Sequence, residues 1–269
     1  MTIRAGVAGW PIAHSLSPLI HGEWIRAAGL DAAYTRFAPE TGDAVRDLVG
    51  QVRNGELRGL NVTAPWKEVA LELADDASPT ARACGSANLV WRDGARLRAD
   101  STDGHGLMAA LGEQAPRLDG TGRVAVVMGA GGAARAAVHA LGQVFDQVRI
   151  INRTSARAEA LIAAVQPHAS ARLVCGDAVS DAALVVNALS VPPAVDVAGL
   201  APDAVLMDMT YRPLMTDFLR AGADRGHTVV DGLAMLIGQA RPSFKTLFGL
   251  EPPDIDVRAG ALRLLGEAP

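Results

Sequence analysis

The sequence predicts an α/β protein of two domains, because short apolar runs alternate with amphipathic stretches along the whole chain. In the first part, this pattern indicates strands at residues 3–8 and 33–37 and helices at residues 17–28 and 42–53. The second part shows a tighter series of strands with helical segments between most of them, at residues 123–128, 148–152, 184–187, 205–209 and 228–230. Strands separated by helices pair in parallel, so we expect mainly parallel sheets.

Other elements follow from local signals. A strand at residues 59–62 leads to a helix that we expect to open at Pro65, since proline is tolerated in a first helical turn. Strands at 86–91 and 96–100 flank Asp93-Gly94, a hairpin turn signal. The tail from Leu233 is helical, with breaks expected at Pro242 and at Pro252-Pro253.

The polar segment 114–122 contains a proline and two glycines and is the best candidate for a surface boundary. We therefore expect one domain to comprise residues 1–113, joined by the C-terminal helices at 233–269. Residues 114–232 then form the second domain.

Composition disfavours several function classes. The formal net charge is −4 and no stretch concentrates Lys and Arg, which argues against nucleic acid as a partner. Cys84 and Cys175 lie far apart in the sequence and form no CxxC pair. This spacing favours reduced thiols and predicts a cytoplasmic protein. No apolar run is long enough for a membrane span, and the six histidines form no metal-binding pair. We therefore expect neither a membrane partner nor a metal, and both a monomer and a homodimer stay open.

The segment VAVVMGAGGAARAAVHAL predicts a dinucleotide site, because a buried strand runs through a G-x-G-x-x-A turn directly into a helix. In this context the first glycine permits the tight turn, the second lets the backbone approach a pyrophosphate, and the final alanine allows close packing. The helix start supplies N–H groups to the phosphates. The second domain is thus expected to be Rossmann-like and doubly wound, with cofactor-binding residues Gly129, Ala130, Gly131, Gly132 and Ala133.

The next strand indicates which dinucleotide is bound. An NAD site usually ends this strand in Asp or Glu, whose carboxylate holds the ribose hydroxyls. Here the strand ends in Asn152-Arg153-Thr154, with Arg157 following. Guanidinium and hydroxyl groups attract a 2′-phosphate that a carboxylate would repel, so the pattern favours NADP.

Several further motifs follow one another in a recognisable order: GWPIAHSLSP, NVTAPWKE, GSANL, STDGHG, MDMTYRP and GLAMLIGQA. With the two cofactor motifs, they make the sequence resemble the shikimate dehydrogenase family over essentially its whole length. The resemblance implies that Lys67 and Asp103 are catalytic. It implies that the substrate is bound by Ser15, Ser17, Asn61, Thr63, Lys67, Asn88, Asp103, Tyr211 and Gln239, and that Met209 and Gly232 lie near the nicotinamide.

The family's activity is a reversible hydride transfer between 3-dehydroshikimate with NADPH and shikimate with NADP. This NADP-dependent oxidation of a CH–OH group belongs to the shikimate pathway, which leads to chorismate and the aromatic amino acids. The resemblance implies a substrate-binding first domain and an NADP-binding second domain. A quinate/shikimate dehydrogenase with broader substrate or cofactor use stays open, as does a non-catalytic NADP-binding sensor on the same scaffold.

The residues by themselves are less decisive. Lys67 falls in the first turn of an expected helix, where the dipole opposes its charge and suits a base, although surface lysines also occupy such positions. On the residues alone, Asp103 is better explained as a helix N-cap than as a catalytic group, and the Ser17-Pro18 pair likewise fits the N-cap and first helical position. The chain departs from the family pattern at Leu89, at Ser101 and at Leu189-Ser190-Val191, which bears on the edge of the nicotinamide site.

Overall fold

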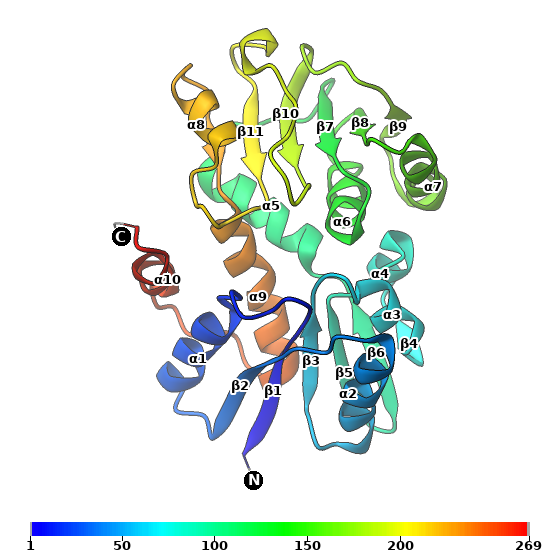
Figure 1. Cartoon of the computed structure of the whole chain (residues 1–269), viewed down its shortest axis with the longest axis vertical. Helices are drawn as coiled ribbons and strands as arrows, with labels where there is room; N and C mark the ends of the chain where they lie inside the picture. The colour runs from blue at the N-terminus through cyan, green and yellow to red at the C-terminus, as the bar shows by residue number, and fades with distance from the viewer. Residues whose placement is uncertain (1, 268–269) are drawn as a thin grey trace. The chain divides into compact units, whose positions relative to one another are not determined.

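The computed structural model describes residues 2–267, which form two compact units. Unit 1 extends to Thr102 and resumes at Gln239, and unit 2 is Asp103–Gly238. Each unit contains a six-stranded sheet with helices packed on it (Figure 1). The predicted two-domain α/β fold is therefore confirmed.

The sheet of unit 1 has the strand order β2-β1-β3-β5-β6-β4. The β1 strand pairs in parallel with β2 and β3, whereas β5 runs antiparallel to both β3 and β6. Its strands are β1 (Ile3–Ala8), β2 (Ala32–Phe37), β3 (Gly59–Val62), β4 (Asp76–Ala77), β5 (Leu89–Asp93) and β6 (Arg96–Asp100). Its helices are α1 (Ser17–Ala27), α2 (Gly42–Asn54), α3 (Lys67–Glu72), α4 (Pro79–Cys84) and α10 (Val257–Leu265), with the second part of α9 (Gly232–Phe248).

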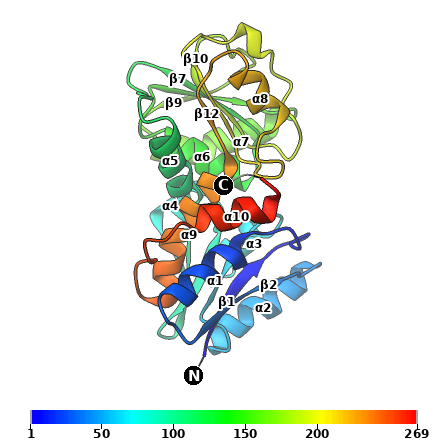
Figure 2. The ribbon, with the colours of Figure 1, turned by 90° about the vertical axis from the view of Figure 1, so that its left-hand side faces the viewer.

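Two cores hold this unit together. On one side, Val45, Val49 and Val52 of α2 pack against Leu60 and Val90 of the sheet. The other core is an aromatic cluster between α1, β2 and α9, formed by His21, Trp24, Tyr34, Phe244 and Phe248. The α10 helix lies along α1 (Figure 2).

The sheet of unit 2 has the order β12-β11-β10-β7-β8-β9, and its pairs are parallel. The order reverses beside β7, and ligands of such sheets bind outside the carboxyl ends of the strands at that point. Its strands are β7 (Val124–Met128), β8 (Gln147–Ile151), β9 (Arg172–Cys175), β10 (Ala182–Asn187), β11 (Val205–Asp208) and β12 (Val229–Val230). Its helices are α5 (Asp103–Gln114), α6 (Gly132–Leu141), α7 (Ser155–Val165) and α8 (Asp217–Ala223), with the first part of α9 and short 3₁₀ turns at Gln166–His168 and Val197–Gly199.

The units divide at positions other than the expected boundaries. The expectation placed residues up to 113 in the first domain, but α5 packs in unit 2, where Leu107, Ala110 and Leu111 join the core of the sheet. Gly104 allows this approach, because a Cβ atom there would lie 3.1 Å from Cβ of Ala140 in α6. At the other end the division falls inside α9, after Gly238 rather than before Leu233.

Several expected details differ in the structure. The expected break at Pro242 is wrong: α9 continues to Phe248, since its last two turns bury Phe244 and Phe248 in the aromatic cluster. The helix expected from Pro65 begins at Lys67, after a turn in which the Trp66 N–H donates to the Thr63 carbonyl. The strand expected from residue 86 begins at Leu89, and the short strands β4 and β9 were not foreseen.

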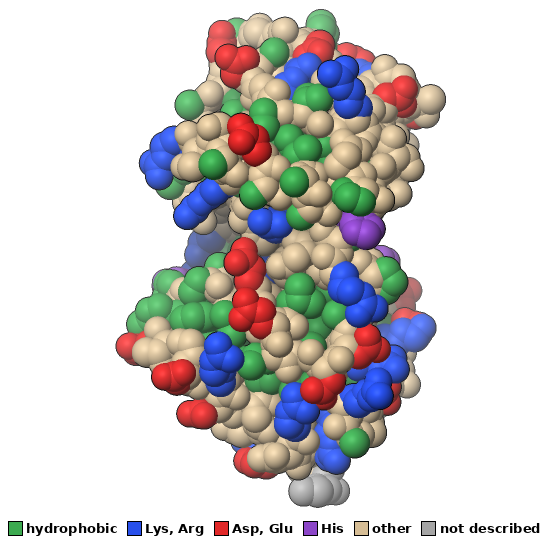
Figure 3. Space-filling model, turned by 90° about the vertical axis from the view of Figure 1, so that its right-hand side faces the viewer, with side chains coloured by type: hydrophobic (Ala, Val, Ile, Leu, Met, Phe, Trp, Pro, Cys, Tyr) green, Lys and Arg blue, Asp and Glu red, His purple; other side chains and the backbone are tan. Residues whose placement is uncertain are grey.

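The surface mixes charges of both signs. On the face in Figure 3, basic and acidic side chains are interspersed over each unit. Among residues 2–267, no helix is long and apolar enough to cross a membrane.

Candidate substrate and cofactor sites

The turn between β7 and α6 has the geometry that the glycine motif predicts. Gly129 has a φ of +116°, which a side chain would strain, and Ala134 is fully buried against the sheet. A Cβ atom at Gly131 would meet nothing within 4 Å, so the backbone there borders open space. The α6 helix begins at Gly132, and its cap residue Gly131 has no side chain to satisfy the first N–H groups. These N–H groups can therefore bind an anion.

A pocket of about 680 Å³ opens beside this turn, at the carboxyl end of β8. Its walls include Asn152, Arg153, Thr154 and Arg157, which places the four predicted NADP residues of this strand end around one cavity. Both arginines are exposed, and no acidic partner is recorded for either among the described residues. Asn152 shapes the strand end, since its Nδ2 donates to the Thr154 carbonyl at 2.8 Å.

Arg149, which was not among the predicted site residues, holds another segment that lines this pocket. Asp177 and Val179 line the pocket from the loop after β9. The Arg149 guanidinium donates to the Ala178 carbonyl at 2.7 Å and to both carboxylate oxygens of Asp181 at 2.7 and 3.0 Å. These bonds lower the pKa of Asp181 and tie the loop to β8.

A buried carboxylate organises the loop after β11, which carries Met209 and Tyr211. Asp208 accepts from the Thr210 N–H, the Thr216 hydroxyl and Nδ2 of Asn187, each within 3.0 Å. Asn187 in turn accepts from the Leu189 N–H at 3.1 Å, so this bond shapes the loop that departs from the family pattern. Gly232 sits directly against this segment, because a Cβ atom there would lie 2.4 Å from the Met209 carbonyl oxygen.

In unit 1, the loops after β1 and β3 meet at the carboxyl edge of two parallel strands. The Thr63 N–H donates to the Ala8 carbonyl at 2.8 Å. A Cβ atom at Gly9 would lie 2.3 Å from Cγ2 of Thr63, so only glycine fits there. Two of the motifs, GWPIAHSLSP and NVTAPWKE, are thereby brought together.

The two predicted carboxylate-binding serines are buried at the start of α1. The expectation that Ser17 caps this helix is wrong, since Ser17 is its first residue and Leu16 is the cap. Ser15 instead accepts the Ser17 N–H at 3.3 Å. Arg36 on β2 fixes the loop by donating from Nη2 and Nε to the Ser15 carbonyl, at 2.7 and 3.3 Å.

Three predicted substrate-binding amides, Asn61, Asn88 and Gln239, form one buried network. Asn88 accepts from the Thr102 N–H at 2.7 Å and donates to Oε1 of Gln239 at 3.2 Å. Asn61 donates to the Asn88 carbonyl at 3.2 Å and to Oγ of Ser243 at 2.8 Å. The structure therefore joins residues that are distant in sequence through direct hydrogen bonds.

The same network lies next to both predicted catalytic residues. Lys67 is half-buried as the first residue of α3, and its carbonyl accepts from the Ala87 N–H at 2.9 Å. Asn88 follows Ala87 and is bonded to Thr102, which directly precedes Asp103. Asp103 is 7% exposed and begins α5. Like Ser17, it is the first residue of its helix, so it lies at the predicted helix start but inside the helix and not at the cap position before it.

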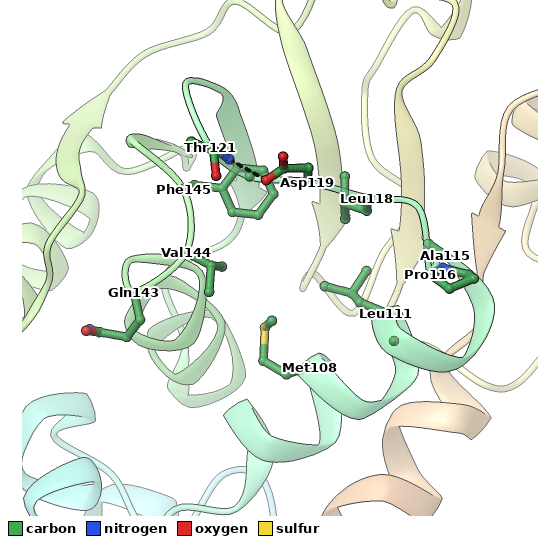
Figure 4. A pocket seen from close by; sticks show the side chains of 12 residues that line it. Met108, Leu111, Ala115, Pro116, Leu118, Asp119, Thr121, Gln143, Val144 and Phe145 are labelled. Carbon is green, nitrogen blue, oxygen red and sulfur yellow. Dashed lines mark hydrogen bonds between the residues drawn. The ribbon is translucent and has the colours of Figure 1, made fainter.

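A second pocket of unit 2, about 490 Å³ in volume, has none of the predicted site residues in its lining (Figure 4). Met108, Leu111, Leu118, Val144 and Phe145 give it an apolar lining. It is bordered by the residues that precede β7, at the amino-terminal edge of the parallel sheet. Ligands of such sheets bind at the opposite edge, so we assign this pocket no role.

Comparison with known proteins identifies the family. A family model described as the shikimate dehydrogenase substrate binding domain matches residues 7–90. The chain is 47% identical to a shikimate dehydrogenase (NADP(+)) of Caulobacter vibrioides, over 98% of this chain and 96% of that relative. This chain belongs to the shikimate dehydrogenase family. The resemblance expected from the motifs is confirmed.

Solved structures of the family share the fold. The shikimate 5-dehydrogenase of Thermus thermophilus, in complex with NADP(H) and shikimate, is 34% identical with a TM-score of 0.86, covering 98% of this chain and all of that one (100%). A quinate dehydrogenase of Corynebacterium glutamicum in complex with NAD is 28% identical with a TM-score of 0.88, covering 97% of this chain and 99% of that one. Relatives of this fold thus include proteins with different polyol acids and different dinucleotides.

The residues that sequence reasoning missed around these sites are supporting ones: Tyr34, Arg36, Arg149, Asp208 and Ser243. Tyr34, Arg36, Arg149 and Ser243 lie outside the motifs and bond to segments that are remote in sequence, whereas Asp208 lies inside MDMTYRP but was not recognised as an organising residue. A signal was available for Asp208 alone, as a carboxylate at the end of an apolar strand.

Proposed function

We propose that this protein is an NADP-dependent shikimate dehydrogenase, which interconverts shikimate with NADP and 3-dehydroshikimate with NADPH. The observation that carries the proposal is near-full-length similarity, at 47% identity, to a relative of that name, in a chain that has both Lys67 and Asp103. We assign substrate binding chiefly to unit 1 and cofactor binding to unit 2; the proposed substrate residues Asp103 and Tyr211 belong to unit 2.

We assign the substrate carboxylate to the hydroxyls of Ser15 and Ser17, with Tyr211 as a third donor. The serines are buried at a helix start, and Arg36 holds the loop that carries them. We assign the ring hydroxyls to Asn61, Thr63, Asn88 and Gln239. A buried polar site of this kind selects a hydroxylated substrate, because an analogue without those hydroxyls would cover polar atoms of the site without offering them a hydrogen bond.

We assign the acid–base work to Lys67 and Asp103, the two residues that the family resemblance makes catalytic. As the hydroxyl becomes a carbonyl, its proton passes to this pair, and the pair returns the proton in the reverse direction. We assign the proton to the pair rather than to either residue alone.

The residues of unit 2 fit a dinucleotide with a 2′-phosphate. The open space at Gly131 and the uncapped start of α6 suit a pyrophosphate, and the pocket at β8 presents two exposed guanidiniums and no strand-end carboxylate. Arg153, Thr154 and Arg157 would hold the 2′-phosphate, and Met209 with Gly232 would border the nicotinamide. When bound, NADP supplies the ring that accepts or returns the hydride.

Quinate is the second candidate substrate, because a quinate dehydrogenase shares this fold with a TM-score of 0.88. That relative was solved with NAD, whereas Arg153 and the absence of an acid at the end of β8 favour NADP in this chain.

A steady-state assay of the full chain tests these assignments. Shikimate and then quinate are supplied with NADP or NAD, and reduced nicotinamide is followed by absorbance. We expect shikimate with NADP to give the highest kcat/KM of the four combinations. No turnover of shikimate with either cofactor would overturn the proposed function, and a preference for quinate or for NAD would correct it.

A further inference from the structure

The hydrogen-bond directions in the amide network are fixed by two backbone groups. A backbone N–H can only donate, so the bond from Thr102 requires Oδ1 of Asn88 to be the acceptor. The Asn88 NH₂ group then donates to the Thr102 hydroxyl at 2.9 Å and to Oε1 of Gln239 at 3.2 Å. The orientation of Gln239 at this contact follows from that of Asn88.

Asn61 is oriented in the same way from the other side. The Asn88 carbonyl can only accept, so the Asn61 group that faces it at 3.2 Å is Nδ2. The second proton of Nδ2 is donated to Oγ of Ser243 at 2.8 Å, and Ser243 donates onward to the Gln239 carbonyl at 3.1 Å. Oδ1 of Asn61 accepts from the Tyr34 hydroxyl at 2.8 Å. Both amide protons of Asn61 are therefore used inside the protein, and an oxygen lone pair is left for the substrate.

Tyr34 is itself held in place by packing. Its ring stacks on His21 with centroids 4.0 Å apart and an interplanar angle of 4°. His21 is fully buried, and neither of its ring nitrogens has a hydrogen-bond partner among the described residues. Burial raises the pKa of Tyr34, so the phenol keeps the proton that it donates. The ring cannot turn away from Asn61 without breaking this stack.

We propose that Tyr34 and Ser243 are positioning residues that fix the amide of Asn61 as an acceptor for a substrate hydroxyl. Neither belongs to a family motif named above, and neither is assigned a contact with substrate. Without the Tyr34 donor and the Ser243 acceptor, the Asn61 side chain is tied only through Asn88 and can rotate. The inference rests on the proposed function, because it takes shikimate as the ligand of this network.

Kinetics of Tyr34→Phe, Ser243→Ala and the double variant test the proposal. One lost hydrogen bond changes affinity by up to about tenfold, so we expect each single change to raise the KM for shikimate roughly five- to tenfold. The value of kcat should stay within about twofold and the KM for NADP should be unchanged, since uniform substrate binding is what is lost. The double variant should resemble the poorer single variant, because both residues act on the same amide.

Thr41→Ala is the matched control for a purely structural loss. It removes the hydroxyl that caps α2 in the same unit, where Oγ1 accepts the Ala44 N–H at 3.3 Å, and it should lower Tm without changing the KM for shikimate. If Tyr34→Phe and Ser243→Ala behave like this control, the positioning role is overturned while wild-type turnover leaves the proposed function intact. An inactive wild type would overturn both.

Discussion

The side chains expected to hold the substrate differ in their surroundings from those expected to hold the cofactor. In unit 1, Asn61, Asn88 and Gln239 are each less than a tenth exposed, and protein groups fix their orientation. In unit 2, Arg153 and Arg157 are exposed side chains at the rim of a pocket of about 680 Å³.

The difference indicates whether the entropy cost of ordering the side chains is incurred on folding or on ligand binding. In the amide network, the side chains lose their conformational entropy when the protein folds. We therefore expect the substrate to bind donors and acceptors whose orientation is already fixed. At the end of β8, we expect two exposed side chains to be ordered by a phosphate that pairs with them, at a cost of about 0.5–1.5 kcal/mol for each. Changes in the two regions should therefore have different kinetic signatures.

The largest effect should come from the acid–base pair. Lys67→Met or Asp103→Asn should lower kcat by about two to four decades, the usual contribution of a positioned proton-transfer group. Shikimate affinity should change far less, and the double variant should be only slightly worse than the poorer single variant. Lys245→Met is the control, since Lys245 is exposed and paired with Glu251. Turnover and calorimetric binding are measured; additive losses would show that the two residues act independently.

On the cofactor side, Arg153→Ala should raise the KM for NADP by about one to two decades, because charge-assisted hydrogen bonds contribute roughly 1.5–3 kcal/mol. Kinetics with NAD should barely move. Arg172→Ala removes an equally exposed guanidinium at the amino-terminal end of β9 and should affect neither cofactor. Equal losses with NADP and NAD in Arg153→Ala would point to a folding defect instead of a lost phosphate contact.

A smaller effect is expected at the start of α1. Replacing both Ser15 and Ser17 by Ala removes two neutral donors, so shikimate binding should weaken about tenfold or somewhat more. NADP affinity should stay near the wild-type value. Calorimetry with each ligand measures both quantities, and unchanged shikimate affinity would leave the serines with a structural role alone.

The most gradual effect concerns the acid stability of the core beneath the network. Burial lowers the pKa of His21 from 6.5 to about 3. Between these values the unfolded chain binds a proton that the folded protein does not, so stability is full above pH 6.5 and falls as the pH drops toward 3. Where the unfolded chain binds one whole proton more than the folded protein, the free energy of unfolding falls by about 1.4 kcal/mol per pH unit.

Chemical unfolding of wild type and His21→Phe at about pH 7.5, 5.5 and 4.5 measures this effect. Other titrating groups cancel in the difference between the two proteins. We expect the wild type to lose stability relative to the variant on acidification below pH 6.5. A difference that does not change with pH would contradict the buried neutral state of His21.

Sequence patterns with local causes predicted most of the fold. The G-x-G-x-x-A turn and the strands of unit 2 were found because glycine conformation and hydrophobic periodicity act over a few residues. The break expected at Pro242 was wrong because tertiary packing of Phe244 and Phe248 outweighs the local cost of a proline in a helix, about 3 kcal/mol. The α5 helix was placed with the first part of the chain because its apolar face does not say which sheet it covers.

In the candidate site, too, residues with a local sequence signal could be predicted and residues that depend on tertiary contacts could not. Lys67, Asp103 and the amides could be predicted as site residues because they sit in contiguous motifs. Tyr34 and Ser243 were not, since a tyrosine on a strand and a serine on a helix read as ordinary core residues until the fold brings them to Asn61.

The central claim is that the substrate-binding groups of unit 1 are ordered before the ligand binds, whereas those of the cofactor pocket in unit 2 become ordered on binding. Hydrogen exchange of the full chain, alone and with each ligand, tests this claim most directly. We predict that amides in residues 86–102 are already protected without ligand and respond little to shikimate. Amides in residues 152–157 and 176–181 should exchange quickly until NADP is added and slowly afterwards. Strong new protection of residues 86–102 by shikimate, or no response of residues 152–157 to NADP, would contradict the account.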